Sequence, residues 1–381
     1  MTIPINRERL AATFTELCEI SSPSRKEGAI AAHLKQAFAA LGADSVYEDD
    51  SAVRTGSESG NLIIRFAGNQ PDREGLFFSC HMDTVEPGTG VKVIRTGDIF
   101  TSAGDTILGG DDKTGIAAVL ELLALLKEHR IPHPKLEVIV TTCEEIGLLG
   151  AKYLDYRKIE TPCGYALDST GIDHVVIGAP AANKIMIEIK GVAAHAGLCP
   201  EAGINALALT VQALSKIRLG RLDEESTCNF GIIQGGVATN IVPEKITLRG
   251  EVRSHSPEKL QRYTDEIFSA FQNTVDNWRG GPGTLDARPA LNVTIVDDYP
   301  PLSLTEDTPV IRRVKKAASD CGKNLRYIVA GGGSDANVFN GFGLPTAIIA
   351  TGMNKVHTIE ERLDLNDLVN LTELLYALTL A

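Results

Sequence analysis

His81 and Asp83 stand two residues apart in the run LFFSCHMDTV, and both carry side chains of kinds found at metal sites. The residues at 76–80 are apolar or small and predict a buried strand, so the polar pair lies at its end. Residues two apart on an extended chain face the same way, so the imidazole and the carboxylate can share one site. This pattern predicts a histidine metal ligand with a supporting acid beside it.

Further acids and imidazoles recur near the ends of predicted strands or at the start of a helix: Asp111, Asp112, Glu144, Glu145, Asp168 and His357. Each alone has a simpler explanation, such as a helix cap, a turn or a loop. In an open α/β sheet, however, ligands bind beyond the carboxyl ends of the strands, and together these side chains would converge there. So many acids would repel one another, and divalent cations remove that conflict. Nitrogen and oxygen ligands without thiolate favour zinc, with manganese or cobalt as substitutes.

The adjacent pair Glu144-Glu145 suggests hydrolysis. Neighbouring residues point in different directions, so one glutamate can bind metal while the other reaches the water. Metal ions lower the pKa of water from 15.7 to about 7, and two-metal hydrolytic sites hold their ions about 3.5–4 Å apart. A free carboxylate can then take the proton and deliver it to a leaving amine.

The elements that must position these residues alternate between strand and helix. Apolar runs at 61–66, 76–80, 136–142 and 164–167 predict strands, and helical patterns occupy 7–20, 27–41 and 114–127. The alternation predicts an α/β fold with a mainly parallel sheet flanked by helices. After residue 301 the same pattern resumes, with helices at 307–321 and 366–380 and strands at 325–329 and 345–350.

Between these parts the order changes to β-α-β-β-α-β, typical of a ferredoxin-like unit. The predicted strands are 183–190, 227–234, 245–252 and 291–297, and the predicted helices are 203–217 and 257–278. We therefore expect a catalytic zinc-binding domain made of residues 1–179 and 299–381, with an inserted lid domain at 180–298.

The composition excludes several classes of protein. The chain has 381 residues, 43% hydrophobic and 23% charged, which is ordinary for a two-domain globular enzyme. A net charge of −12 without a basic stripe argues against nucleic acid as a partner. No signal peptide is recognised, and the longest apolar run, GIAAVLELLALL, is interrupted by Glu121, so no membrane association is expected. Seven cysteines without a C-x-x-C pair fit reduced thiols and a cytoplasmic location.

Several motifs in one order resemble a known family. HMDTV, LGGDDKTG, TTCEEIGLLGAKYLD, ALDST, GVAAHAG, GGVATNIVP and VHTIEERLDL are similar to the co-catalytic dizinc metallopeptidases, which include peptidase T, carboxypeptidase G and aminoacylase. The resemblance covers nearly the whole chain. DDKTG and EEIGLLGAK look most like peptidase T-like proteins.

The resemblance implies two Zn²⁺ ions per subunit, with Co²⁺ or Mn²⁺ as substitutes. It implies His81 and Asp168 on one ion, Glu145 and His357 on the other, and Asp111 bridging both. Glu144 would be the general base, and Asp83 would orient His81. It also suggests a cis peptide bond at Asp111-Asp112.

Substrate contacts are expected from further residues. His195 could stabilise the oxyanion, and in relatives of the family this histidine reaches a partner protomer, which implies a homodimer. Asn240 resembles another substrate contact of the family. Arg253 could bind a substrate carboxylate in a bidentate way. Gly332 and Gly333 lie in a loop that could offer backbone N–H groups to a carboxylate. The other histidines, His174 among them, are predicted to lie at the surface.

The predicted function is hydrolysis of an amide bond in short peptides, as in a tripeptidase or aminopeptidase. One alternative is an N-acyl amino acid amidohydrolase with the same metal site. Another is a non-catalytic protein that binds metal or peptide, although binding alone needs neither Glu144 nor Asp83.

Overall fold

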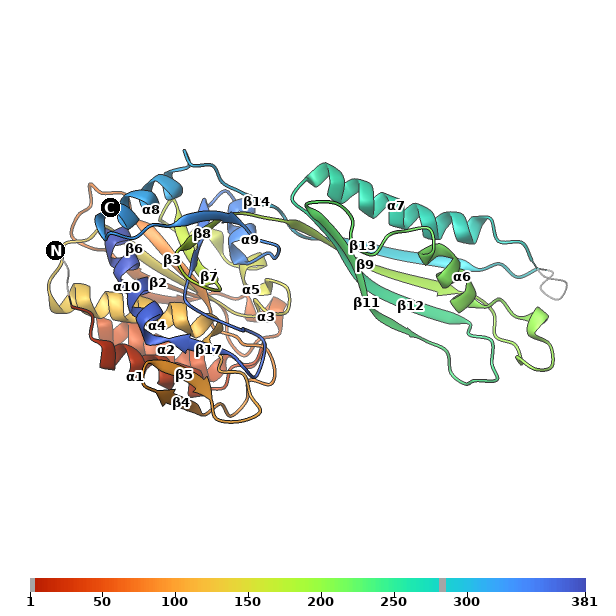
Figure 1. Ribbon diagram of the computed structural model, residues 1–381, viewed down its shortest axis with the longest axis horizontal. Helices are drawn as coiled ribbons and strands as arrows, with labels where there is room; N and C mark the ends of the chain where they lie inside the picture. The colour runs from red at the N-terminus through yellow and green to blue at the C-terminus, as the bar shows by residue number, and fades with distance from the viewer. Residues whose placement is uncertain (1–3, 281–285) are drawn as a thin grey trace. The chain divides into compact units, whose positions relative to one another are not determined.

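The chain folds into two compact units. The computed structural model describes residues 4–280 and 286–381. The first unit comprises the residues up to Gly178 together with Ser303–Ala381, and the second comprises Ala179–Leu302 (Figure 1). The roles predicted for these parts, catalysis and lid, stay predictions.

A nine-stranded sheet forms the centre of the first unit. Its strands lie in the order β1 (Ser45–Glu48), β2 (Leu62–Phe66), β6 (Leu136–Thr141), β3 (Leu76–His81), β7 (Gly164–Ser169), β16 (Thr346–Ala350), β8 (His174–Ala179) and β14 (Leu302–Ser303), and β15 (Arg326–Val329) also pairs with β8. The central strand β3 is parallel to β6 and β7, and β16 is parallel to β7, whereas β1, β2 and β8 bring antiparallel pairs. Strands β3 and β6 are buried along their whole length, which explains their continuous apolar sequences. The predicted fold class, α/β with a mainly parallel sheet flanked by helices, is confirmed.

Helix α4 is the central helix of the first unit. The helices of this unit are α1 (Arg7–Glu19), α2 (Gly28–Leu41), α3 (Ala52–Thr55), α4 (Gly110–Glu128), α5 (Leu149–Lys152), α8 (Pro309–Asp320), α9 (Asp335–Gly341) and α10 (Leu365–Leu380), with a 3-10 helix at Tyr156–Lys158. Helix α4 packs on β3 and β7, and α1, α2 and α10 pack against α4. It is therefore buried on all sides, which explains why its run IAAVLELLALL is apolar apart from Glu121, whose carboxylate pairs with Arg9 at 2.6 Å.

A small sheet completes the first unit. It contains β4 (Val93–Thr96), β5 (Ile99–Ser102) and β17 (Arg362–Asp364), with β5 in the middle. Strand β17 follows the segment that carries His357, so this sheet fixes one end of that segment.

The second unit is an antiparallel sheet covered by helices. Its sheet order is β10 (Gly220–Arg221), β11 (Ser226–Gly235), β12 (Lys245–Ser254), β9 (Ala181–Lys190) and β13 (Ala290–Tyr299). Helices α6 (Ala206–Leu214) and α7 (Pro257–Asp276) pack on each other and on β9 and β12, and a 3-10 helix occupies Pro200–Ala202. Apart from the short β10, the order β9-α6-β11-β12-α7-β13 is that of a ferredoxin-like unit (Figure 1).

Alternating side chains explain the second unit's core. Along β9, Ile185, Ile187 and Ile189 are buried, whereas Lys184 and Met186 are exposed on the other face. Helix α7 begins after Ser256, whose hydroxyl accepts the N–H of Lys259 at 3.2 Å, with a proline at the first helical position.

The sequence patterns missed several elements of the first unit. Strand β8 is the most important of these, because it extends the main sheet beyond β16. The others are short: β1, β4, β5, β14, β17, α3 and α5.

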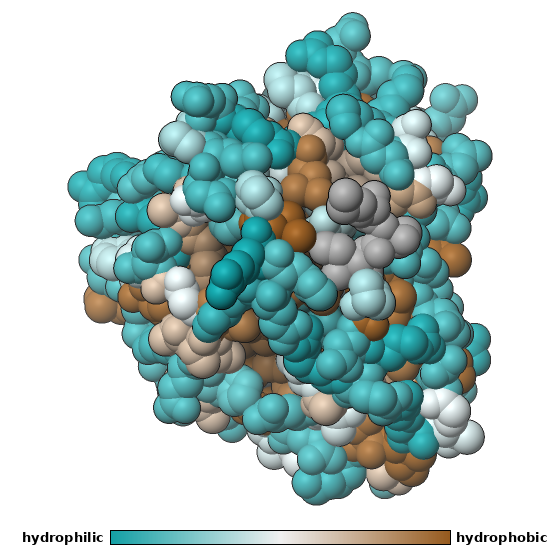
Figure 2. Space-filling view, turned by 90° about the vertical axis from the view of Figure 1, so that its left-hand side faces the viewer, coloured by the Kyte–Doolittle hydropathy of each residue, from teal (hydrophilic) through white to brown (hydrophobic). Residues whose placement is uncertain are grey.

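The surface of the first unit is polar on the side that carries the carboxyl terminus. Figure 2 shows that face as mostly hydrophilic, with hydrophobic residues in small groups. Within residues 4–280 and 286–381, no helix combines the length and hydropathy needed to cross a membrane.

Candidate metal centre

The carboxyl ends of three parallel strands meet at one edge of the main sheet. His81 ends β3, Glu144 and Glu145 follow β6, and Asp168 lies at the end of β7. Because β3 is parallel to both β6 and β7, the three ends lie side by side. The sequence reasoning predicted this convergence from the position of polar residues after apolar runs.

His81, Asp111 and Glu145 form a group with ligand atoms close enough to hold one ion. One ligand atom from each lies within 4.8 Å of the other two. His81 Nε2 is 3.1 Å from Asp111 Oδ1. His81 is 2% exposed, so water does not compete strongly for its ring.

His357 joins the same group from the segment after β16. Its Nε2 atom lies 3.0 Å from Glu145 Oε1 and 3.3 Å from Asp111 Oδ2. Asp111 therefore contacts an imidazole with each of its carboxylate oxygens, His81 with Oδ1 and His357 with Oδ2. A carboxylate with one imidazole on each oxygen is suited to bridge two cations, and the donor set of imidazoles and carboxylates suits zinc.

Two more acids lie within electrostatic reach. Burial raises the pKa of Glu144 well above its ordinary value, and the negative charge of Asp168 raises it further. Burial also raises the pKa of Asp168 well above its ordinary value, with the charge of Asp111 adding to the effect. Protonation relieves the repulsion between such acids, and so would a bound cation.

For the two imidazoles of the group, a raised pKa favours the charged form. Hydrogen bonds with Asp111 and Glu145 raise the pKa of His357 to about 10. Burial opposes the charge on His81, but hydrogen bonds with Asp111 and Asp83 raise its pKa well above the ordinary value. The carboxylates thus favour a proton on each imidazole, and a metal ion would compete with that proton for the ring nitrogen.

Asp83 organises the centre through its backbone and its carboxylate. His81 Nδ1 lies 2.9 Å from the backbone carbonyl oxygen of Asp83, and 3.6 Å from the nearer carboxylate oxygen. The nearest contact with the ring is therefore the carbonyl, and the carboxylate turns to the glutamates. It accepts the backbone N–H groups of Glu144 at 2.9 Å and Glu145 at 3.3 Å, and the Ser24 hydroxyl at 2.6 Å.

The backbone near the ligands departs from regular structure. The Asp111-Asp112 peptide bond is cis, as the resemblance suggested. Cys143, before Glu144, has φ of 53°, and His357 has φ of 62°, a left-handed conformation that non-glycine residues seldom adopt.

Three buried acids near these loops were missed by sequence reasoning. Glu27 accepts the backbone N–H of Cys143 at 3.1 Å, and Glu361 accepts the N–H of Asp111 at 3.1 Å. Asp335, at the start of α9, accepts the Thr141 hydroxyl at 2.5 Å. The motif around His357 contained a usable signal, since Glu361 follows it in VHTIEE; the sequence around Glu27 contained none.

His174, predicted to lie at the surface, is instead 8% exposed. Its Nε2 atom is 3.0 Å from the Ser169 hydroxyl, and its Nδ1 atom is 3.1 Å from the Ile172 carbonyl oxygen. The surface prediction was wrong because β8, the strand that begins with His174, was not recognised.

The remaining predicted substrate residues lie elsewhere in the chain. Gly332 and Gly333 precede α9 in the first unit. His195, Asn240 and Arg253 belong to the second unit. There His195 Nδ1 accepts two backbone N–H groups at 3.2 Å, which leaves the ring proton on the exposed Nε2. The Arg253 guanidinium pairs with Glu251 at 2.9 Å.

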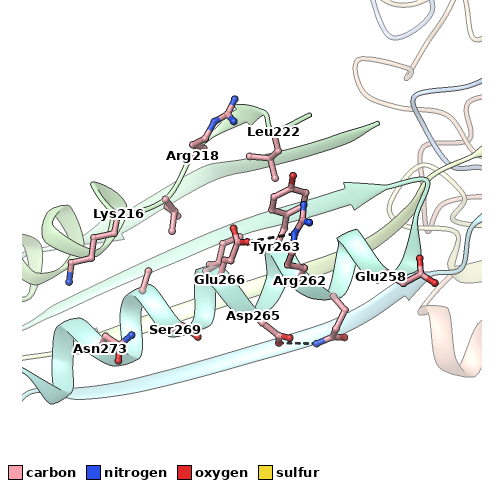
Figure 3. Close-up of a pocket in the computed structure, with 14 residues that line it drawn as sticks. Lys216, Arg218, Leu222, Glu258, Arg262, Tyr263, Asp265, Glu266, Ser269 and Asn273 are labelled. Atoms are coloured by element: carbon pink, nitrogen blue, oxygen red, sulfur yellow. Dashed lines mark hydrogen bonds and ion pairs between the residues drawn. The ribbon is translucent and has the colours of Figure 1, made fainter. Parts of the chain in front are cut away.

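A surface groove of about 920 Å³ lies in the second unit, beside α7. None of the predicted site residues lines it. Figure 3 shows Arg262 and Glu266 on α7, which form an ion pair of 3.7 Å. The side-chain amide of Gln261 donates to Asp265 at 2.8 Å. The residues that line this groove are therefore different from those of the metal centre.

Comparison with known proteins identifies the family of this chain. The model of Peptidase family M20/M25/M40 matches residues 77–381. The chain belongs to this family and is therefore a peptidase.

Within the family its likeness is to peptidase T-like proteins. The structure of aminopeptidase PepT from Bacillus cereus has 38% identity and a TM-score of 0.88, and a tripeptidase from Staphylococcus aureus has 35% identity and a TM-score of 0.91. Each comparison covers 98% of both chains. The uncharacterized protein YqjE of Bacillus subtilis is 39% identical over 375 residues, 98% of each chain.

Proposed function

We propose that this protein hydrolyses an amide bond in short peptides with the help of two Zn²⁺ ions, as a tripeptidase or aminopeptidase. The observation that carries the proposal is the contact of Asp111 with two imidazoles, one on each carboxylate oxygen. The names of the two solved relatives, aminopeptidase and tripeptidase, support the substrate class.

Each ion would have its own ligands. His81 and Asp168 would hold one ion, Glu145 and His357 would hold the other, and Asp111 would contact both. When bound, the ions lower the pKa of a water molecule and polarise the substrate carbonyl.

Glu144 is the proposed general base. A carboxylate next to the proposed ligand Glu145 can take a proton from the attacking water and then deliver it to the leaving amine. The backbone N–H of Glu144 donates to the Asp83 carboxylate at 2.9 Å, and this hydrogen bond holds the main chain of the proposed base close to the proposed ligands.

The second unit would supply substrate contacts. His195, with a proton on Nε2, can donate to the developing oxyanion. Asn240, Arg253 and the backbone at Gly332 and Gly333 are proposed to bind the substrate's polar groups. We also propose that the second unit acts as a lid, that the protein forms a homodimer and that it is located in the cytoplasm.

The test compares substrate classes on one preparation. Purified protein is assayed against a panel of tripeptides and against N-acetyl and N-succinyl amino acids, with metal content measured by mass spectrometry. We expect tripeptide hydrolysis, two zinc ions per chain, loss of activity after chelation and recovery on adding Zn²⁺. Hydrolysis of the acylated amino acids alone would replace the peptidase proposal by the amidohydrolase.

A further inference from the structure

Glu361 connects the two segments that carry Asp111 and His357. Its side chain is 2% exposed. The carboxylate accepts the backbone N–H of Gly109 at 2.8 Å and that of Asp111 at 3.1 Å. A Cβ atom on Gly110 would lie 3.1 Å from Glu361 Oε1, so the carboxylate rests directly against this backbone.

Glu361 and His357 belong to one closed loop. Asn354 and Arg362 exchange backbone hydrogen bonds of 3.1 and 3.2 Å, which join the two ends of the loop. Within it, the N–H of Glu361 donates to the Thr358 carbonyl at 3.1 Å. Because the loop is closed at its base and folded at its tip, His357 and Glu361 cannot move independently over long distances.

The same loop therefore holds Asp111 at two points. His357 Nε2 contacts the Asp111 carboxylate at 3.3 Å, while Glu361 holds the Asp111 backbone N–H. Within residues 4–280 and 286–381, Glu361 has no hydrogen bond to any other predicted ligand in the structure. It therefore acts on the site through the backbone of Asp111 and Gly109.

We propose that Glu361 is a positioning residue that ties the bridging ligand Asp111 to the loop of His357 and so sets the affinity of the centre for its ions. This inference rests on the proposed dizinc function. Hydrogen bonds to a charged acceptor are about twice as strong as neutral ones, so a buried carboxylate can hold two amides firmly. Loss of such outer partners commonly lowers metal affinity or activity by about 10–100-fold.

The matched variants are Glu361→Gln and Glu360→Gln. A glutamine at 361 keeps the length of the side chain but has one acceptor oxygen, so Gly109 or Asp111 loses its partner. Glu360 is adjacent and exposed, and its carboxylate pairs with Lys355, away from the Asp111 backbone. Metal-free protein is titrated with Co²⁺ while visible absorption reports the coordination of the ion, and peptide hydrolysis is measured at each Co²⁺ concentration.

We expect E361Q to bind Co²⁺ about 10–100-fold more weakly than wild type, with activity recovering at high Co²⁺, and E360Q to match wild type. Unchanged Co²⁺ affinity in E361Q overturns the inference, even if its metal-free melting temperature falls, because the residue would then serve folding alone. Failure of the proposed function is distinguishable, since wild type itself would then bind no Co²⁺.

If E361Q does not fold, Gly110→Ala tests the same contact by pushing against the carboxylate. Weaker Co²⁺ binding in G110A supports the inference, and unchanged binding overturns it.

Discussion

Asp83 Oδ1 accepts the backbone N–H of Glu144 at 2.9 Å and thereby joins the end of β3 to the turn after β6. The backbone carbonyl of the same residue lies 2.9 Å from the ring of His81. One residue thus fixes a proposed metal ligand on one strand and the main chain of the proposed base on the next.

Replacing Asp83 by asparagine should weaken this link. The amide group keeps one acceptor oxygen, but its NH₂ group would face a backbone N–H, so Glu144 or Glu145 loses a partner. We expect turnover of a tripeptide to fall by about 10–100-fold while the protein still folds. Steady-state kinetics and circular dichroism on the same sample measure both quantities. Asp72→Asn, an exposed control, should match wild type, and a D83N enzyme with full turnover would contradict the role given to Asp83.

Alanine substitutions at the two neighbouring glutamates should have different effects on turnover and zinc content. Glu144→Ala should lower turnover by about 10²–10⁴-fold, the usual contribution of a general base, and leave zinc content near normal. Glu145→Ala removes a proposed ligand that lies 3.0 Å from His357, so it should lose zinc. Metal analysis beside kinetics separates the two outcomes. If E144A lost its zinc and E145A kept it, the assignments would have to be exchanged.

The sequence allowed several of the proposed ligands to be predicted because they follow local rules. A continuous apolar run such as LFFSC marks a buried parallel strand, and a polar residue directly after it marks the sheet edge where ligands gather. His81, Glu145 and Asp168 all follow this rule, and their positions could be read without knowing which strands are neighbours.

The contacts that the supporting residues make follow no local rule. Glu27 holds the backbone of Cys143, and Glu361 holds that of Gly109, a residue far away in the sequence. Strand β8 was missed for a related reason: it pairs with β15 and β16, which come late in the chain, and Pro180 alone separates it from β9. Contacts of this kind depend on the folded arrangement, which spacing along the chain does not contain.

Asp335 should make the metal-free protein less stable as the pH rises. Burial raises the pKa of this carboxyl to about 6, and the hydrogen bond from Thr141 offsets part of that effect. Because the folded pKa lies above the unfolded value of 3.8, the stabilising contribution is present below about pH 4 and is lost as the pH rises through 6. Asp335→Asn removes the titration and keeps the shape. The free energy of unfolding of wild type relative to D335N should therefore fall by about 2 kcal/mol between pH 4 and 7.

Urea denaturation in the presence of a chelator, repeated across this pH range, measures that difference. Asp307→Asn, at an exposed position, should show no such trend. A difference between wild type and D335N that stays constant with pH would show that the buried carboxyl does not titrate as described.

The two units have separate hydrophobic cores, and this predicts that they can be destabilised separately. Phe271 on α7 is fully buried in the core of the second unit, and Phe78 on β3 is 1% exposed in the core of the first. Removing a buried phenylalanine ring costs about 3–5 kcal/mol. Phe271→Ala should therefore raise hydrogen exchange in β9, β12 and α7 and leave the zinc content unchanged, because every proposed ligand belongs to the first unit.

Phe78→Ala should raise exchange in the first unit and lower zinc content as well, since Phe78 and His81 lie on the same strand. Hydrogen-exchange mass spectrometry with metal analysis distinguishes these outcomes, and loss of zinc in F271A would show that the two cores unfold together.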